Sequence, residues 1–67
     1  MSEIKTNIYT VIVRHPNSMM TIETKNYTTK KEAIKYARSV VRDLYEVDVY
    51  HDGENIAYSR EDRLAIA

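Results

Sequence analysis

The chain has 67 residues, a formal net charge of zero, one glycine, one proline and no cysteine. A chain this short forms one domain (residues 1–67, with 60–67 peripheral) and buries only about 60% of its unfolded surface, which argues against a deep substrate cleft. The lack of cysteine excludes disulfides and thiolate metal sites, and residues 1–9 and the short apolar runs predict no signal peptide or membrane span, so we expect a cytoplasmic protein.

The first predicted element is a strand over residues 7–14, "NIYTVIVR", which is rich in β-branched and aromatic residues. Pro16, Asn17 and Ser18 then favour a turn, because proline fixes φ and the two short polar side chains can bond their own backbone. A second strand over residues 19–25, "MMTIETK", completes a predicted β-hairpin.

A helix is predicted to begin at Thr29. Thr29 and Glu32 form a capping box, in which the hydroxyl and the carboxylate each satisfy a free backbone N–H of the first turn. The apolar side chains that follow fall within an arc of about 140°, the width of a core-facing stripe. This arc comprises Ala33, Ile34, Ala37, Val40, Val41, Leu44 and Tyr45. No glycine or proline interrupts the pattern before about residue 45.

Residues 46–59, "EVDVYHDGENIAYS", predict a second hairpin. Two alternating runs flank Asp52 and Gly53, the pair that best tolerates the positive φ of a type I′ turn. The tail, residues 60–67, is compatible with a short helix, an edge strand or a frayed end, and the sequence leaves these alternatives open.

The predicted fold is α+β with the order ββαββ: a four-stranded, mainly antiparallel sheet with one helix packed on one face. A right-handed crossover through the helix is expected if the second and third strands are parallel. The predicted inner face comprises Tyr9, Val11, Val13, Met20, Ile22, Val47, Val49, Ile56 and Tyr58. Alternation then sends Ile8, Thr10, Ile12, Met19, Thr21, Asp48, Tyr50 and Ala57 outward.

Four cations form a stripe along the predicted helix. Lys31, Lys35, Arg38 and Arg42 lie within about 60° of one another and flank the apolar arc. Such a stripe suits phosphates spaced along a duplex or an acidic groove on another protein. The alternative is a solvated flank whose aliphatic stems cover the margin of the core.

Charge is divided unevenly along the chain. Residues 1–45 carry eight Lys or Arg and four Asp or Glu, whereas residues 46–67 carry two and six. Such a split is compatible with internal charge pairing, with a surface that orients a partner, or with head-to-tail self-association. A strongly basic nucleic-acid-binding protein would have a net excess of cations, which this chain lacks.

The predicted outer face is apolar for a surface in contact with water. Three occupants compete for it: the apolar residues of the tail (Leu64 and Ile66), a second copy in a homodimer, or another protein. The residues that would make this contact are Ile8, Ile12, Met19 and Tyr50. Tyr36 lies off the core arc and is expected to be exposed, and the six tyrosines are expected to ring a thin core where each hydroxyl reaches water.

No catalytic, metal or cofactor site is predicted. His15 and His51 flank turns, and their spacing matches no metal motif. The single glycine rules out a glycine-rich phosphate-binding loop, and no nucleophile elbow or carboxylate pair is present. We therefore expect a protein that is not an enzyme.

The segment from "MTIETKNYTTKKEAIKYARSV" to "VDVYHDGENIAYSRE" resembles small phage and mobile-element proteins, among them compact anti-CRISPR inhibitors. The resemblance covers about half of the chain and is carried by the A-x-x-x-A spacing of the helix and by the Asp-Gly hairpin. It implies a non-enzymatic inhibitor that occupies a nucleic-acid-binding or partner-binding surface of a host complex.

The hypothesis that joins these observations is a small inhibitor that binds a host protein or nucleoprotein complex. The helix cations would meet an acidic surface, and Ile12, Met19 and Tyr50 would serve as apolar anchors, with Tyr36 beside them. The alternative is a nucleic-acid-binding protein that uses the helix stripe, as a monomer or as a dimer.

Overall fold

The computed structural model describes residues 8–61 and 63–67, and within them the chain forms one helix and one five-stranded sheet. The elements are β1 (Tyr9–Arg14), β2 (Thr21–Tyr27), α1 (Lys30–Arg42), β3 (Glu46–His51), β4 (Glu54–Arg60) and β5 (Arg63–Ile66). The α+β class is confirmed. The predicted number of four strands is wrong, because the tail adds β5 beside β4.

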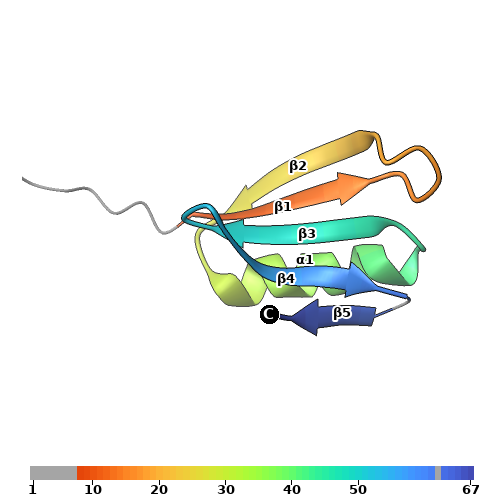
Figure 1. Ribbon diagram of the computed structural model, residues 1–67. Coiled ribbons are helices and arrows are strands. Elements are labelled where there is room, and N and C mark those ends of the chain that lie inside the picture. Colours follow the sequence, from red (N-terminus) through yellow and green to blue (C-terminus); the bar gives the residue numbers. More distant parts are fainter. Residues whose placement is uncertain (1–7, 62) are drawn as a thin grey trace, which may run out of the picture.

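The strand order in the sheet is β2-β1-β3-β4-β5, and each neighbouring pair is antiparallel. The helix α1 lies across one face of this sheet and crosses behind β3 and β4 in Figure 1. Because β2 and β3 both run antiparallel to β1, they are parallel to each other, and α1 connects them across β1. The condition for a right-handed crossover is therefore met.

The core between helix and sheet consists of valine and alanine alone. Its members, all buried, are Val11, Val13, Ala33, Ala37, Val40, Val41, Val47, Val49 and Ala57. The described residues include no buried polar or charged side chain. Each buried valine contributes about 1.5 to 3 kcal/mol to folding, so a core of this composition gives a thin but dry layer. The predicted helix stripe is confirmed from Ala33 to Val41.

The two ends of α1 are set by local chemistry. The Thr29 hydroxyl accepts from the Glu32 N–H at 3.3 Å and donates to the Glu32 carboxylate at 3.2 Å, so the cap is present although the carboxylate does not take the predicted backbone N–H. The helix ends at Arg42, because Leu44 adopts a φ of 66°. Leu44 is 70% exposed and Tyr45 is also exposed, so their predicted place in the core stripe is wrong.

A β-bulge at Ile22 reverses the predicted alternation of β2. The register with β1 shifts between Val13 and Arg14, which leaves Ile22 without a partner, and Glu23 stands opposite Val13 on the helix side. Met20 lies before the strand and is exposed, and Ile22 is 52% exposed, so neither takes the core position that we predicted.

A second register shift, between Val49 and Tyr50, alters the faces of β4. Ala57 stands opposite Val49 and is fully buried, although alternation placed it outward. Tyr58, predicted inward, lies on the outer face. Ile56 is the bulged residue and packs against the core from its margin.

The second hairpin and the tail complete the sheet. Asp52 and Gly53 have φ values of 53° and 79°, which confirms the predicted type I′ turn. In β5, Leu64 is half-buried and packs against the core on the helix side. Of the three occupants left open for the outer face, the tail is therefore excluded for Leu64, and of the alternatives for the tail the edge strand is the one observed.

Candidate functional site

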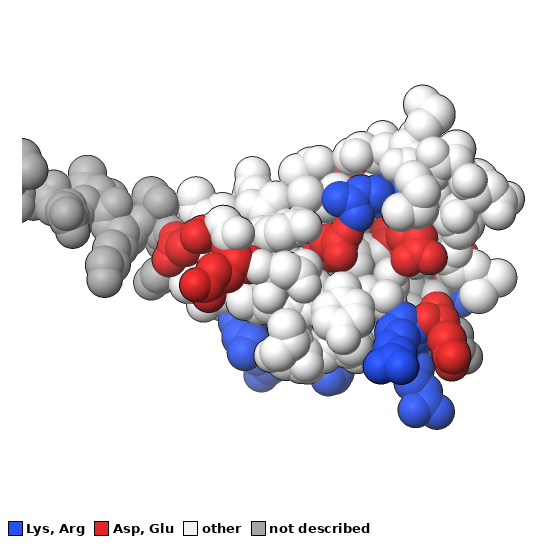
Figure 2. Space-filling view, in the orientation of Figure 1, with Lys and Arg blue, Asp and Glu red and all other residues white. Residues whose placement is uncertain are grey.

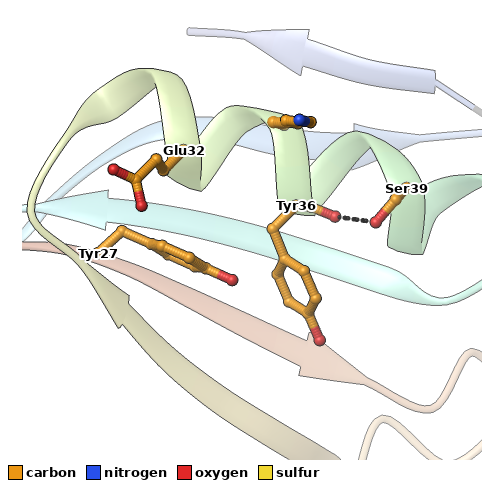
Figure 3. A pocket seen from close by; sticks show the side chains of 5 residues that line it. Tyr27, Glu32, Tyr36 and Ser39 are labelled. Carbon is orange, nitrogen blue, oxygen red and sulfur yellow. Dashed lines mark hydrogen bonds between the residues drawn. The ribbon is translucent and has the colours of Figure 1, made fainter.

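One side of α1 faces β2, and Tyr36 on that side connects the helix to the strand. The Tyr36 hydroxyl donates a hydrogen bond to the Glu23 carboxylate, and its ring lies 5.8 Å from that of Tyr27, centroid to centroid. The Lys25 amine lies 4.8 Å from the centroid of the Tyr36 ring. Figure 3 shows both tyrosine rings between the helix and the strands. Tyr36 is half-buried, so the prediction that it is exposed is wrong.

This tyrosine margin offers no acid–base chemistry near neutral pH. The hydrogen bond to Glu23, with partial burial, raises the pKa of Tyr36 to about 12, so the phenol keeps its proton. The adjacent hollow, of about 380 Å³, is lined by Tyr27, Glu32, Lys35, Tyr36 and Ser39. In this hollow the Ser39 hydroxyl donates to the Tyr36 carbonyl oxygen at 2.7 Å. In residues 8–61 and 63–67, no three His, Cys, Asp or Glu side chains are placed to hold a metal ion.

The other margin of α1 is basic. Lys31, Lys35, Arg38 and Arg42 are all exposed. Within the described part of the chain, the ion pair formed by a Lys or Arg side chain joins Arg14 to Asp48, so no helix cation is paired with a described carboxylate. Internal pairing with the acidic C-terminal half, one of the three alternatives for the uneven charge, is therefore observed for Arg14 but for none of the four helix cations.

Sequence reasoning missed one member of this basic margin. Lys30 begins α1 and, with Lys31, Lys35 and Arg38, lines a hollow of about 590 Å³ that has Ile34 as its apolar member. Lys30 falls inside the apolar arc of the helical wheel, so the search for a cationic stripe did not include it. Its place in the first turn nevertheless predicts an exposed side chain. We call the five cations Lys30, Lys31, Lys35, Arg38 and Arg42 the basic ridge.

The basic ridge and the tyrosine margin lie on different sides of α1. At about 100° per residue, the four predicted cations are about 100 to 160° around the helix from Tyr36. Tyr36 contacts β2, which places the ridge on the solvent side and toward β5. Figure 2 views the sheet from the face opposite α1, where Asp and Glu are spread across the surface and most visible Lys and Arg atoms lie along the lower margin near β5.

The remaining predicted site residues lie elsewhere. Ile12 and Tyr50 are half-buried on the outer face of the sheet, which is the face opposite the helix. This face is mixed rather than apolar, because the Arg14–Asp48 ion pair crosses it. Met19 is 54% exposed and lies in the loop before β2, not on a strand.

The structure thus divides the predicted site into separate surfaces. The cations of the ridge lie together, Tyr36 belongs to the opposite margin of the helix, and the apolar anchors are on the far side of the sheet or in a loop. A single flat partner cannot contact the ridge and the outer face at once. The ridge is the surface on which the largest number of predicted residues meet.

A comparison of the chain with protein-family models, with curated proteins and with solved structures finds no match. In the described ranges, α1 is too short and too polar to cross a bilayer.

Proposed function

We propose that this chain is a non-enzymatic binding protein that docks its basic ridge on an acidic surface of a protein or nucleoprotein and inhibits that partner by occupying the surface. A phage or mobile-element inhibitor of a host complex is the role that we assign to it. The observation that supports the proposal is a line of four exposed cations along one side of α1, with Lys30 beside them in the first turn, none of them ion-paired with a described carboxylate.

The position of two ridge cations supports a role in binding rather than in folding. Lys30 and Lys31 occupy the first turn of α1, where the helix dipole is positive. A cation at the N-terminal end destabilises the helix by about 0.3 to 1 kcal/mol relative to a cation at the C-terminal end. An acidic residue in the first turn would be stabilising. Folding alone gives no reason to keep two lysines there, whereas an anionic partner does.

The ridge has the dimensions of a protein-sized contact. From Lys31 to Arg42 it extends about 16 Å along the helix. Ile34 lies among the cations and is half-buried, so it gives the ridge an apolar point that a partner can desolvate. Desolvated anchors carry most of the affinity in protein interfaces, and surrounding charges give orientation and association rate.

Nucleic acid is the second candidate partner. The spacing of Lys31, Lys35, Arg38 and Arg42 repeats once per helical turn, so the cations form a continuous line that can follow a phosphate backbone. Four phosphate contacts predict a slope of about −3.6 in log K against log salt, while an acidic protein partner gives a shallower dependence.

The test is capture from a bacterial lysate by the immobilised chain, with and without nuclease, followed by mass spectrometry. Lys31→Glu combined with Arg38→Glu should reduce capture at least about tenfold. Arg60→Glu combined with Arg63→Glu is the charge control, because it changes the net charge equally at exposed residues of β4 and β5 rather than of α1.

Each outcome is decisive for the ridge. Nuclease-resistant capture that the ridge variant loses and the control retains supports a protein partner. Nuclease-sensitive capture with a slope near −3.6 on a labelled duplex selects the second candidate instead. Capture that survives both ridge substitutions refutes the ridge as the binding surface.

A further inference from the structure

The sheet has two open edges, and they differ in length. The edge strand β5 has four residues, whereas β2 has seven. In the described structure β2 pairs only with β1, so its other side presents unpaired backbone N–H and C=O groups. Neither a proline nor a glycine interrupts Thr21–Tyr27. An edge of this length is a template for another strand.

We propose that β2 pairs with the β2 strand of a second copy. The two strands run antiparallel about a two-fold axis through Thr24, so two five-stranded sheets become one sheet of ten strands. A two-fold interface is self-complementary, because each residue meets its counterpart twice. Overlap of all seven residues allows at most about eight backbone hydrogen bonds between the copies, and the bulge at Ile22 lowers that number.

Charge selects this register. With the axis at Thr24, Glu23 of each copy stands directly opposite Lys25 of the other, and all seven residues of the strand overlap. Moving the axis to Glu23 or to Lys25 places like charges opposite each other and shortens the overlap to five residues. Opposite charges facing each other across strands stabilise a pair, and like charges destabilise it. The register with the longest overlap is thus also the complementary one.

The side chains at this edge already point to the required faces. Glu23 and Lys25 stand opposite Val13 and Val11, on the helix side of the sheet. Tyr36 contacts both, through a hydrogen bond to the carboxylate and through its ring face beneath the amine. In the paired sheet, the two charges of one copy meet those of the other beside this ring.

The second copy also covers apolar surface beside β2. A hollow of about 300 Å³ on the helix side is lined in part by Ile22, Tyr36 and Tyr45, and Ile22 is 52% exposed. The two-fold axis runs perpendicular to the sheet, so both helices lie on the same face and flank the joined β2 strands. The bulge at Ile22 lies outside the central Glu23–Lys25 segment. The basic ridges face away from the axis and remain accessible.

The first experiment is sedimentation of the full chain over a range of concentrations. The wild type should dimerise, and Glu23→Lys or Lys25→Glu alone should weaken dimerisation at least about tenfold, because each places two pairs of like charges in the interface. The double exchange, Glu23→Lys with Lys25→Glu, should restore the dimer. Glu54→Lys and Lys31→Glu are exposed controls away from the edge, and circular dichroism checks folding.

The second experiment uses the absence of cysteine in the chain. Thr24→Cys places a single thiol on the two-fold axis, where opposing Cα atoms are about 4.5 to 5.5 Å apart, within the range of a disulfide. Mild oxidation should therefore link two copies. Asn26→Cys is the control on the same face of β2, because its two copies are about 13 Å apart along the strands.

These experiments can overturn the proposal independently of the folding of any one variant. A wild-type chain that stays monomeric at about 1 mM refutes the proposed dimer. The same holds if the monomer instead pairs β2 with a strand of another protein. A dimer that neither single reversal weakens, or cross-linking of Asn26→Cys instead of Thr24→Cys, shows that another surface or register joins the copies. The proposal is supported if the double exchange restores the dimer and Thr24→Cys cross-links two copies.

Discussion

The polar groups at the two margins of α1 differ in the contacts that they make. On the β2 side, Tyr36 contacts Glu23, Lys25 and Tyr27, so ring, carboxylate and amine hold one another. On the opposite side, the basic ridge makes no ion pair with a described carboxylate. The difference teaches that one side of a helix can hold a neighbouring strand through polar contacts, while the charges on its other side stay available for a partner.

The largest effect is expected at the tyrosine margin. Tyr36→Ala removes a half-buried ring together with its hydrogen bond, and it should lower the free energy of unfolding by about 2 kcal/mol, below the 3 to 5 of a fully buried aromatic. Chemical denaturation measures this value. Tyr36→Phe, which keeps the ring, should lose about 1 kcal/mol. A loss below about 0.5 kcal/mol for the alanine variant would mean that the margin is not structural.

The same margin predicts a pH dependence. The pKa of Tyr36 is raised from 10.0 to about 12 in the folded state, so its contribution to stability is present below pH 10 and is lost as pH rises from 10 to 12. Subtracting the ultraviolet titration of Tyr36→Phe from that of the wild type isolates this phenol. Its midpoint should fall toward 10 in Glu23→Gln. A wild-type midpoint near 10 would contradict the hydrogen bond.

The smallest effects are expected on the ridge, where they have opposite signs at the two ends. Lys31→Glu places an acid in the first turn and should raise the free energy of unfolding by about 0.3 to 1 kcal/mol, whereas Arg42→Glu in the last turn should lower it by a similar amount. Thermal denaturation at low salt measures both. If Lys31→Glu is clearly destabilising, the ridge contributes to the fold and the contrast between the margins disappears.

Local chemistry made most elements of the fold predictable. The cap at Thr29 and the turn at Asp52 and Gly53 lie where the sequence placed them, because each depends on residues close together in the chain. Alternation failed in β2 and β4 because bulges at Ile22 and Ile56 add a residue to one strand without a partner in the other. A bulge is set by pairing between strands, which the hydrophobic pattern of one strand does not encode.

The candidate site was predictable in part. The stripe of cations follows from helical spacing, and the structure places all four on one exposed side. The position of Tyr36 depended on the face that β2 presents, and this face was reversed by the bulge at Ile22. The outer-face anchors failed to join the ridge because a helix and the far side of a sheet point in opposite directions, whatever their composition.

The alanines of the core determine where aromatic rings fit. Ala33, Ala37 and Ala57 are fully buried where helix and sheet meet, so the two layers approach closely along the middle of the molecule. A six-membered ring has no room there, and each of the six tyrosines is at least partly exposed at the periphery. A larger residue at Ala37 would separate the layers and lift the Tyr36 hydroxyl from its acceptor. The small size of these alanines therefore also governs contacts at the rim, such as the hydrogen bond from Tyr36 to Glu23.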